Sequence, residues 1–471
     1  MSKELTPDLC VIGAGSGGLS VAAAAAAMGV SVVLIEKGEM GGECLNAGCV
    51  PSKALLAAAH AAHRMRTARR LGVTAENVNV DFAAVMAHVR ASVAAIAPND
   101  SEARYRAMGV QVIRAAARFV ARDKVEAGGC VIRARRFVVA TGSAPIVPNI
   151  PGLEQIRFLT NESIFKLDAR PDHLVILGAG AVGVELAQAF ARLGVRVTLL
   201  DAGRAMARED EEFSDIIANA LRRDGVDLRE NVKALRAEAQ GAGFALHLDD
   251  ATRVEGSHLL LATGRRANVE GLGLEAAGVR RRKDGALVGA DLRTSNRRVY
   301  LIGDAAGGPQ FTHAANYHAG LVLRAALFRL RARATPESVP RVLFTDPELA
   351  VCGLTETEAR KRHGAIRVLR WPVAENDRAR AEGVTGGHAK IITSRNGRIV
   401  GAAIAGPGAG ELIGMWQVAV ARGLNVRAMA GVVLPYPTLN EVGKRAALTA
   451  LAPAAASGWL RSLLGLLRKF G

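Results

Sequence analysis

A glycine pattern that occurs twice constrains the fold of this chain more than any other feature. The first copy is VIGAGSGGLSVAAAAAAMGVSVVLIE at 11–36, and the second, 165 residues later, is ILGAGAVGVELAQAFARLGVRVTLLD at 176–201. Each copy has an apolar run, the spacing G-x-G-x-x-G, an alanine-rich stretch, a second apolar run, and an acid 18 residues after the last glycine. This order predicts a strand, a helix and a second strand around a dinucleotide site.

The two copies assign the same chemical role to matching residues. Glycines permit a tight turn and a close approach of pyrophosphate to the helix N-terminus, and the acid accepts hydrogen bonds from a ribose. One G-x-G-x-x-G also occurs where a turn only has to pack, but two copies with equally spaced acids argue against chance. The candidate binding residues are Gly13, Gly15, Gly18 and Glu36 in the first copy, and Gly178, Gly180, Gly183 and Asp201 in the second.

A second pair of segments supports this prediction. FVVATGSAP at 137–145 and LLATGRRAN at 260–268 each follow an apolar strand and contain Ala-Thr-Gly. Such turns suit a strand that returns beside a bound dinucleotide, which adds Thr141, Gly142 and Gly264 to the candidate cofactor contacts. Two dinucleotides in one chain indicate electron transfer between them.

Length and cysteine content limit the class of protein. A chain of 471 residues with 50% hydrophobic content should divide into about three or four domains. Its five cysteines are too few and odd in number for a secreted disulfide framework, so we expect a reducing compartment, the cytoplasm. The uncharged run at 9–35 is as long as a membrane span, but glycines interrupt it, and we interpret it as a buried strand–helix–strand unit.

The net charge of +17 raises the question of a nucleic-acid partner. The arginines are dispersed, aromatic residues make up only 4% of the chain, and no nucleic-acid motif occurs. We therefore expect a solvated basic surface and no nucleic-acid partner. Anionic small substrates and membrane lipids remain open.

Three further segments carry a resemblance to a known family. They are GGECLNAGCVPSKALL at 41–56, VYLIGDAAG at 299–307 and FTDPELAVCGLTE at 344–356. With the repeated glycine pattern, they make the chain resemble the dimeric flavoprotein disulfide reductases, the family of dihydrolipoamide dehydrogenase, glutathione reductase and mercuric reductase. The likeness covers residues 8–452 in the family's order of motifs.

The resemblance implies an α/β fold with two Rossmann-like dinucleotide-binding domains, for FAD and NAD(P), and a C-terminal α+β dimerisation domain. The change to short β-rich segments after residue 344 agrees with this order. We expect the FAD domain at 1–150 and 273–340, the NAD(P) domain at 151–272, the dimerisation domain at 341–452, and a basic amphipathic helix at 453–471.

The resemblance also assigns the cofactor contacts. It implies that the first glycine pattern holds FAD and the second the nicotinamide cofactor, and that Gly303 and Asp304 contact the FAD ribityl chain. Asp304 could equally cap the helix that follows it. Asp201 would repel a 2′-phosphate, which favours NADH over NADPH, although Arg204 lies close in sequence. No metal site is expected.

By the same resemblance, Cys44 and Cys49 form the redox-active pair, with Cys49 beside the flavin and Cys44 facing the substrate. A helix that starts at the second cysteine would favour its thiolate, and Pro51 suits a first-turn position. Lys53 and Glu185 resemble the family's ion pair near the reactive edge of the flavin. Either residue alone could be an ordinary surface charge.

One segment departs from the family. In the family, a C-terminal His-Pro-Thr of one subunit completes the other's active site, and its histidine pairs with a glutamate. Here YPTLNE places Tyr436 at the histidine position and keeps Glu441. A tyrosine, with a pKa near 10, is a poor base at neutral pH. Mercuric reductases also carry tyrosine in this segment, but the cysteine pair expected near their C-terminus is missing after Cys352.

We therefore expect a homodimeric, FAD-dependent NAD(P)H oxidoreductase, similar to dihydrolipoamide dehydrogenase, that acts on a disulfide or dithiol. Reduction of metal ions as in mercuric reductase, reduction of quinones, and a low-turnover flavin-bearing partner or membrane-surface protein are the alternatives. GWLRSLLGLLRKFG at 458–471 has apolar residues on one helical face and basic residues on the other. It could lie on anionic lipid, or dock on its own subunit or dimer partner.

Overall fold

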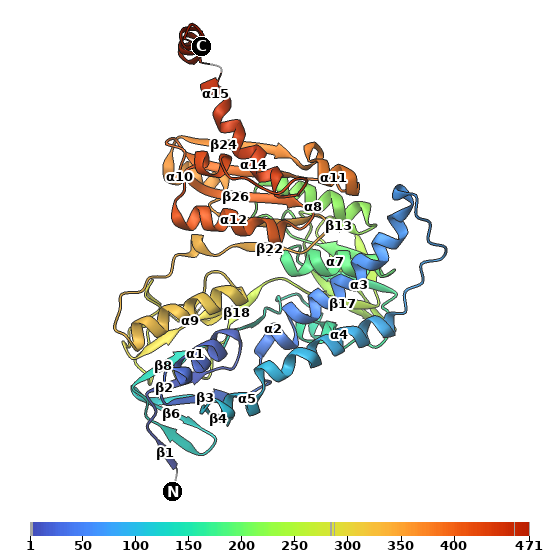
Figure 1. Cartoon of the computed structure of the whole chain (residues 1–471). Coiled ribbons are helices and arrows are strands. Elements are labelled where there is room, and N and C mark those ends of the chain that lie inside the picture. Colours follow the sequence, from blue (N-terminus) through green and yellow to red (C-terminus); the bar gives the residue numbers. More distant parts are fainter. Residues whose placement is uncertain (1–2, 283–284, 287, 456, 471) are drawn as a thin grey trace. The chain divides into compact units, whose positions relative to one another are not determined.

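The computed structural model describes residues 3–282, 285–286, 288–455 and 457–470 (Figure 1). The chain divides into two compact units, and each unit collects segments that lie far apart in the sequence. Unit 1 consists of residues 1–63, 78–202 and 229–336, and unit 2 consists of residues 64–77, 203–228 and 337–471.

Unit 1 contains two parallel sheets, and one copy of the glycine pattern belongs to each. The first sheet has the strand order β21-β8-β2-β3-β4. The strand β2 and most of β3 are buried, as expected for a parallel sheet that is covered on both faces. Helix α1 connects β2 to β3 and packs beside α9. The bounds are β2 Leu9–Ile12, α1 Ser16–Ala27, β3 Val32–Glu36, β4 Gln111–Arg114, β8 Arg136–Val139, β21 Val299–Leu301 and α9 Thr312–Ala326.

The second parallel sheet has the order β10-β17-β11-β12-β13 and repeats the same arrangement. Helix α7 connects β11 to β12, as α1 connects β2 to β3. The predicted α/β class with two Rossmann-like halves is thereby confirmed. The bounds are β10 Phe158–Leu159, β11 His173–Leu177, α7 Ala181–Arg192, β12 Arg196–Leu200, β13 Asp227–Arg229 and β17 His258–Leu261.

Smaller elements complete unit 1. Antiparallel strands form the sheets β1-β7-β6-β5 (with β1 and β7 parallel), β14-β15-β16, β9-β18 and β19-β20. The short helix α2 and the 19-residue helix α3 follow β3 and carry the cysteine pair. The bounds are β1 Lys3–Leu5, α2 Gly42–Asn46, α3 Cys49–Thr67, α4 Phe82–Ile96, α5 Glu102–Ala107, β5 Arg118–Ala121, β6 Lys124–Ala127, β7 Cys130–Ile132, β9 Ser143–Pro145, α6 Asn161–Ile164, β14 Ala234–Gln240, β15 Gly243–Leu248, β16 Arg253–Gly256, β18 Arg265–Ala267, β19 Arg281–Arg282 and β20 Gly285–Ala286.

Unit 2 is built on an antiparallel sheet with the order β22-β23-β26-β25-β24. Helix α12 packs on β23 and β26, and Trp416 is among the largest side chains of the core. This mixture of strands and helices is the α+β domain predicted from residue 344 onward. The bounds are α8 Glu211–Arg223, β22 Arg341–Leu343, β23 Glu348–Gly353, α10 Glu356–His363, β24 Ile366–Pro372, α11 Asp377–Glu382, β25 His388–Ser394, β26 Ile399–Gly406, α12 Ala409–Arg422, α13 Val426–Ala430 and α14 Glu441–Leu448.

The C-terminal segment differs from the single helix predicted at 453–471. Two helices are present, α15 at Ala452–Ala455 and α16 at Gly458–Leu467. The Ser457 side chain accepts a hydrogen bond from the backbone N–H of Leu460, so it caps a new helix. Residues 456 and 471 of the predicted helix lie outside the described residues.

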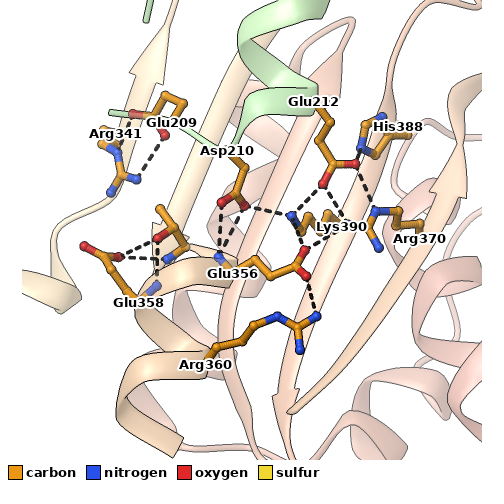
Figure 2. Close-up of polar contacts among 11 residues, drawn as sticks. Glu209, Asp210, Glu212, Arg341, Glu356, Glu358, Arg360, Arg370, His388 and Lys390 are labelled. Carbon is orange, nitrogen blue, oxygen red and sulfur yellow. Dashed lines mark hydrogen bonds and ion pairs between the residues drawn. The ribbon is translucent and has the colours of Figure 1, made fainter. Parts of the chain in front are cut away.

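A buried lysine joins four elements of unit 2 (Figure 2). Lys390 in β25 is only 1% exposed. Its Nζ lies 2.8 Å from Asp210 Oδ2, 2.5 Å from Glu212 Oε1 and 2.7 Å from Glu356 Oε2. Arg370 from β24 binds both Glu212 and Glu356, each at 2.9 Å. The Lys390 cluster, which consists of these five residues, therefore links α8 and its N-cap to α10, β24 and β25.

The charges of the cluster stabilise one another. Burial by itself raises the pKa of Glu212 and Glu356. Hydrogen bonds from the surrounding cations have the larger effect, so both pKa values are lowered overall, to about 2 for Glu356. Burial also lowers the pKa of Lys390, yet its three carboxylate partners raise it overall. Depressed carboxyl pKa values stabilise the fold above pH 4.5, and this stabilisation is lost as pH falls toward about 2.

We expect Lys390→Met to lower the free energy of unfolding of unit 2 by about 2–3 kcal/mol, because three half-buried carboxylates then lose their shared cation. Urea unfolding followed by tryptophan fluorescence measures this, since Trp371, Trp416 and Trp459 all belong to unit 2. The control is Lys361→Met on the exposed side of α10, with an expected change within about 0.5 kcal/mol. Equal unfolding midpoints for the two variants would contradict a stabilising role of the cluster.

Candidate functional site: two dinucleotide-binding turns and a cysteine pair

The two glycine turns have nearly identical geometry. Gly13 and Gly178 both have φ of +105°, which only glycine adopts readily. A Cβ on Gly13 would lie 2.4 Å from the carbonyl oxygen of Ala140, and one on Gly178 would lie 2.4 Å from that of Ala262. The glycines therefore let each turn pack directly against the Ala-Thr-Gly segment that returns beside it.

The acid of each copy reaches back to the turn. Glu36 Oε2 accepts a hydrogen bond from the backbone N–H of Ala14 at 2.5 Å, and Asp201 Oδ2 accepts one from Ala179 at 2.6 Å. The acids therefore lie at the ends of β3 and β12, where a ribose is bound in sites of this kind. Their equivalent contacts support one role for both copies.

The helix N-termini fit a dinucleotide pyrophosphate. α1 and α7 begin after Gly15 and Gly180, and neither end has a side-chain cap or an acid in its first turn. Gly18 and Gly183 sit so close to the carbonyls of Gly13 and Gly178 that a side chain would collide with the backbone. First-turn N–H groups without a side-chain acceptor suit a phosphate. The residues of both turns therefore fit the groups that the sequence implies.

The two Ala-Thr-Gly turns are joined to each other. β9 and β18 pair antiparallel directly after them. Thr141 Oγ1 donates to the Asn268 carbonyl at 2.6 Å, and the Asn268 N–H donates to the Gly142 carbonyl at 2.9 Å. Gly264 has φ of +132°, in the region that favours glycine. The predicted Thr141, Gly142 and Gly264 thus lie where the chain crosses between the two sheets.

The cysteine pair lies where α2 ends and α3 begins. Cys49 is the first residue of α3, as predicted, and Cys44 lies in α2. A hydrogen bond from Cys44 lowers the pKa of Cys49 most, and Thr312 and Lys53 add to this, so the value falls to about 6 despite the opposing effect of burial. The same hydrogen bond and burial raise the pKa of Cys44. Of the two thiols, Cys49 is therefore the more acidic.

Thr312 is a site residue that the sequence prediction missed. It is the first residue of α9, and its Oγ1 lies 3.3 Å from Cys49 Sγ. Its hydroxyl lowers the pKa of both cysteines, which is the effect of a donor to a thiolate. Threonine at a helix start normally indicates only a cap, so the sequence carried no sign of this contact.

The predicted ion pair at the cysteine helix is formed. Lys53 Nζ lies 2.9 Å from Glu185 Oε2, although the residues are 132 positions apart. Lys53 is on the second turn of α3 and Glu185 is buried in α7. The pair joins the cysteine helix to the helix of the second glycine pattern, and its effect on a flavin remains a prediction.

A polar network around Glu43 was also missed. Glu43 directly precedes Cys44 and forms an ion pair with Arg265, which directly follows Gly264. Asn161 Nδ2 donates to Glu43 Oε1 at 2.9 Å and to the Ala47 carbonyl at 3.2 Å. Burial raises the pKa of Glu43 to about 7, and Arg265 opposes this. The network fixes the backbone between the two cysteines.

Asp304 belongs to the same network. Its Oδ2 accepts a hydrogen bond from Ser143 Oγ at 2.5 Å and lies 4.0 Å from Arg265 Nε. It follows Gly303 in a short 3₁₀ turn after β21, and it caps no helix through its side chain in the described residues. The contact of Asp304 with the FAD ribityl chain stays a prediction.

Tyr436 and Glu441 lie in unit 2. Tyr436 is 69% exposed, and its hydroxyl donates to Asp377 Oδ2 at 3.0 Å. This hydrogen bond raises the pKa of Tyr436 above its ordinary value, so even less tyrosinate is present at neutral pH to accept a proton than in an isolated tyrosine. Glu441 is the first residue of α14. The carboxylate that contacts residue 436 is thus Asp377, a partner that was not predicted from the sequence.

Comparison with known families agrees with this geometry. Residues 7–319 match the family described as pyridine nucleotide-disulphide oxidoreductase, and residues 339–447 match its dimerisation domain. The chain belongs to the pyridine nucleotide-disulphide oxidoreductases. The suspected family is thereby confirmed, and the dimerisation domain of this oxidoreductase supports a homodimer.

Relatives of this oxidoreductase have different substrates in their names. A mercuric reductase of Streptomyces lividans is 38% identical over 456 residues, 94% of this chain and 96% of the relative. A dihydrolipoyl dehydrogenase of Geobacillus stearothermophilus is 33% identical over 455 residues, with the same coverage. The HOCl-induced flavoprotein disulfide reductase RclA of Escherichia coli, solved as a Cu(II) complex, has a TM-score of 0.85 at 28% identity, covering 95% of this chain and 100% of RclA.

These comparisons establish the class of cofactor. Pyridine nucleotide-disulphide oxidoreductases of this kind use FAD and NAD(P)H, which agrees with the two glycine turns. In the part of the chain that the structure describes, no helix is long and apolar enough to cross a membrane, and no group of three or more His, Cys, Asp or Glu side chains could hold a metal ion.

Proposed function

We propose that this oxidoreductase is a cytoplasmic, NADH-dependent flavoenzyme that passes two electrons through Cys44 and Cys49 to a small disulfide, in the manner of a dihydrolipoamide dehydrogenase. The observation that carries the proposal is the state of Cys49. It begins α3, contacts Thr312, and has a pKa of about 6, so it is a thiolate at neutral pH when the pair is reduced. A structural cysteine has no need of such surroundings.

The residues of the chain have distinct tasks in this proposal. Gly13, Gly15, Gly18, Glu36 and Asp304 would hold FAD, which accepts electrons from the nicotinamide and delivers them to the disulfide. Once the pair is reduced, Cys49 keeps the negative charge, and Cys44 keeps its proton because its pKa is raised. The Cys44 sulfur then attacks one sulfur of an incoming disulfide, whose S–S bond breaks, and the Cys44 proton passes to the sulfur that leaves. Cys49 attacks the Cys44 sulfur of this mixed disulfide and closes the Cys44–Cys49 disulfide, and the second acceptor sulfur leaves and takes a proton from water.

Reduction of a soft metal ion is the second candidate. It is favoured by Tyr436, which supplies no base for dithiol chemistry and is bound to Asp377 instead. Two neighbouring thiolates suit soft metal ions, and such ions need no proton transfer from residue 436. No cysteine follows Cys352, so any metal ion would have to reach the pair without a C-terminal cysteine pair.

An acceptor panel tests the proposal. NADH oxidation is measured with lipoamide, glutathione disulfide, mercuric ion and a benzoquinone, each at the same protein concentration and at pH 7. The proposal expects lipoamide-type disulfides to give the highest kcat/KM. Preference for mercuric ion would support the second candidate. Preference for the quinone would indicate that electrons reach the acceptor without passing through the Cys44–Cys49 disulfide. Turnover no faster than with oxygen alone would indicate a low-turnover flavoprotein.

The choice of nicotinamide cofactor gives a further prediction. We expect NADH to be the better donor, because Asp201 would repel the 2′-phosphate of NADPH. Arg204 does not offset this, since its guanidinium binds Glu211 and Asp215, both on α8. Asp201→Ser should narrow the NADH preference in kcat/KM by about tenfold. Asp168→Ser, at a side chain that is 91% exposed, serves as the control for general loss of charge. A wild-type preference for NADPH would contradict the assignment.

A further inference from the structure

The last helix of the chain has an apolar face that the other described elements leave largely exposed. None of the residues in α16 is buried. Trp459 is 73% exposed, Leu466 and Leu467 are each 52% exposed, and Phe470, just beyond the helix, is 81% exposed. Large apolar side chains are rarely left together in water without a function.

The apolar and basic side chains of this segment are fully separated around the helix axis. At 100° per residue, the seven apolar residues fall within an arc of about 160°. The polar residues and the two glycines of the helix, Gly458 and Gly465, fall in the opposite arc. The apolar set is Trp459, Leu460, Leu463, Leu464, Leu466, Leu467 and Phe470, and the basic set is Arg461, Arg468 and Lys469.

The charge of this region has one sign. Glu441 is the last acidic residue of the chain, and five basic residues follow it, namely Lys444, Arg445, Arg461, Arg468 and Lys469. In the described part of the chain, the three cations of the α16 segment form no ion pair with a carboxylate. This basic segment would therefore attract an anionic partner.

The helix lies outside the part of the chain that matches the family's dimerisation domain. The dimerisation domain ends at residue 447, and α16 begins at Gly458 beyond it. A tryptophan at one end and a phenylalanine at the other suit the boundary between lipid headgroups and acyl chains, where one side of a helix is apolar and the other is in water. The helix is too short to cross a bilayer.

We propose that α16 binds the surface of membranes that contain anionic lipids. Its apolar face would enter the headgroup boundary, and its three cations would contact lipid phosphates. The proposal does not depend on the identity of the electron acceptor. It would place the oxidoreductase at a surface where apolar acceptors are concentrated.

Co-sedimentation of the full-length protein with vesicles tests this proposal. The vesicles are phosphatidylcholine alone, and phosphatidylcholine with phosphatidylserine. We expect binding only to the anionic vesicles, weakened by high salt, because the cations act at the surface through screened charges. Replacing both Trp459→Ser and Phe470→Ser, or all of Arg461→Gln, Arg468→Gln and Lys469→Gln, should reduce the bound fraction by at least about tenfold.

The control is Phe328→Ser, which removes an aromatic side chain of unit 1 that is 58% exposed. It should leave binding unchanged, and NADH-driven reduction of ferricyanide should be equal in all variants, since α16 has no buried residue to destabilise. Equal binding to neutral and anionic vesicles would overturn the proposal, and so would equal binding by all variants. Absence of lipid binding would overturn it as well. If the Trp459 and Phe470 variant then also forms a smaller oligomer, the apolar face is a contact between copies of the chain.

Discussion

Replacing Cys49 with serine is expected to abolish turnover with every disulfide acceptor, and to remove the long-wavelength absorbance that a thiolate gives beside an oxidised flavin. Cys44→Ser should abolish the same turnover but keep that absorbance without any reduction. The difference follows from the site, because Cys49 is the residue with the lowered pKa, and Thr312 and Lys53 would still stabilise its charge in the Cys44 variant. Absorbance spectra of the two variants at equal flavin content measure it.

The pH dependence of this absorbance measures the pKa of Cys49 directly. In Cys44→Ser, the serine hydroxyl can still donate to Cys49, so the band should form as pH rises through about 6 rather than 9. Cys130→Ser is the control, because this partly exposed cysteine in β7 has no role in the proposed reaction. Identical spectra for the Cys44 and Cys49 variants would reject the assignment of roles.

Tyr436→His is expected to accelerate dihydrolipoamide oxidation at pH 7 by about 10²-fold, at the lower end of the usual contribution of a general base. In the wild type, this reaction should be slow at pH 7 and rise toward high pH, where the substrate thiol ionises unaided. Tyr436 cannot replace a histidine, because its pKa is raised further by the hydrogen bond to Asp377. Reduction of the enzyme by NADH should stay fast in both proteins. Stopped-flow measurement of the two half-reactions separates them.

Two carboxylates could orient the new imidazole. Glu441 is the partner that the family resemblance implies, whereas Asp377 is the residue that contacts position 436 in the structure. Adding Glu441→Gln to Tyr436→His should cancel the gain, and adding Asp377→Asn tests the second partner. Tyr436→Phe is the matched control. Fast wild-type oxidation of dihydrolipoamide at pH 7, unchanged in Tyr436→Phe, would show that another residue is the base.

Local patterns of the sequence were sufficient to predict the parallel sheets and their turns. The spacing that joins Gly13 to Glu36 lies within one strand–helix–strand unit, so its geometry follows from adjacent residues. The start of α3 at Cys49 was predictable for the same reason. The break between α15 and α16 was missed, because Ser457 looked like one more small residue in an alanine-rich run.

Contacts between distant charges could not be predicted. Glu43 and Arg265 pair across 222 positions, and each looks like an ordinary charge beside a glycine. Lys390 lies in an apolar strand, where a lone lysine favours an edge position rather than full burial, and its acids lie up to 180 residues away. Lys53 and Glu185 were paired only through the family resemblance. Coulomb attraction depends on the distance between two charges in space, and the periodicity of the sequence does not predict that distance.

The Lys390 cluster also bears on how the chain is made. Asp210 and Glu212 leave the ribosome 180 and 178 residues before their cation does. At about 5–20 residues per second, Lys390 follows Asp210 after about 10–40 s. During this interval α8 cannot join the sheet of unit 2, whose strands all come from later residues, 341–406. Helix α8 must therefore remain uncovered until the last third of the chain has been synthesised. The rate of translation between Asp210 and Lys390 determines how long this lasts.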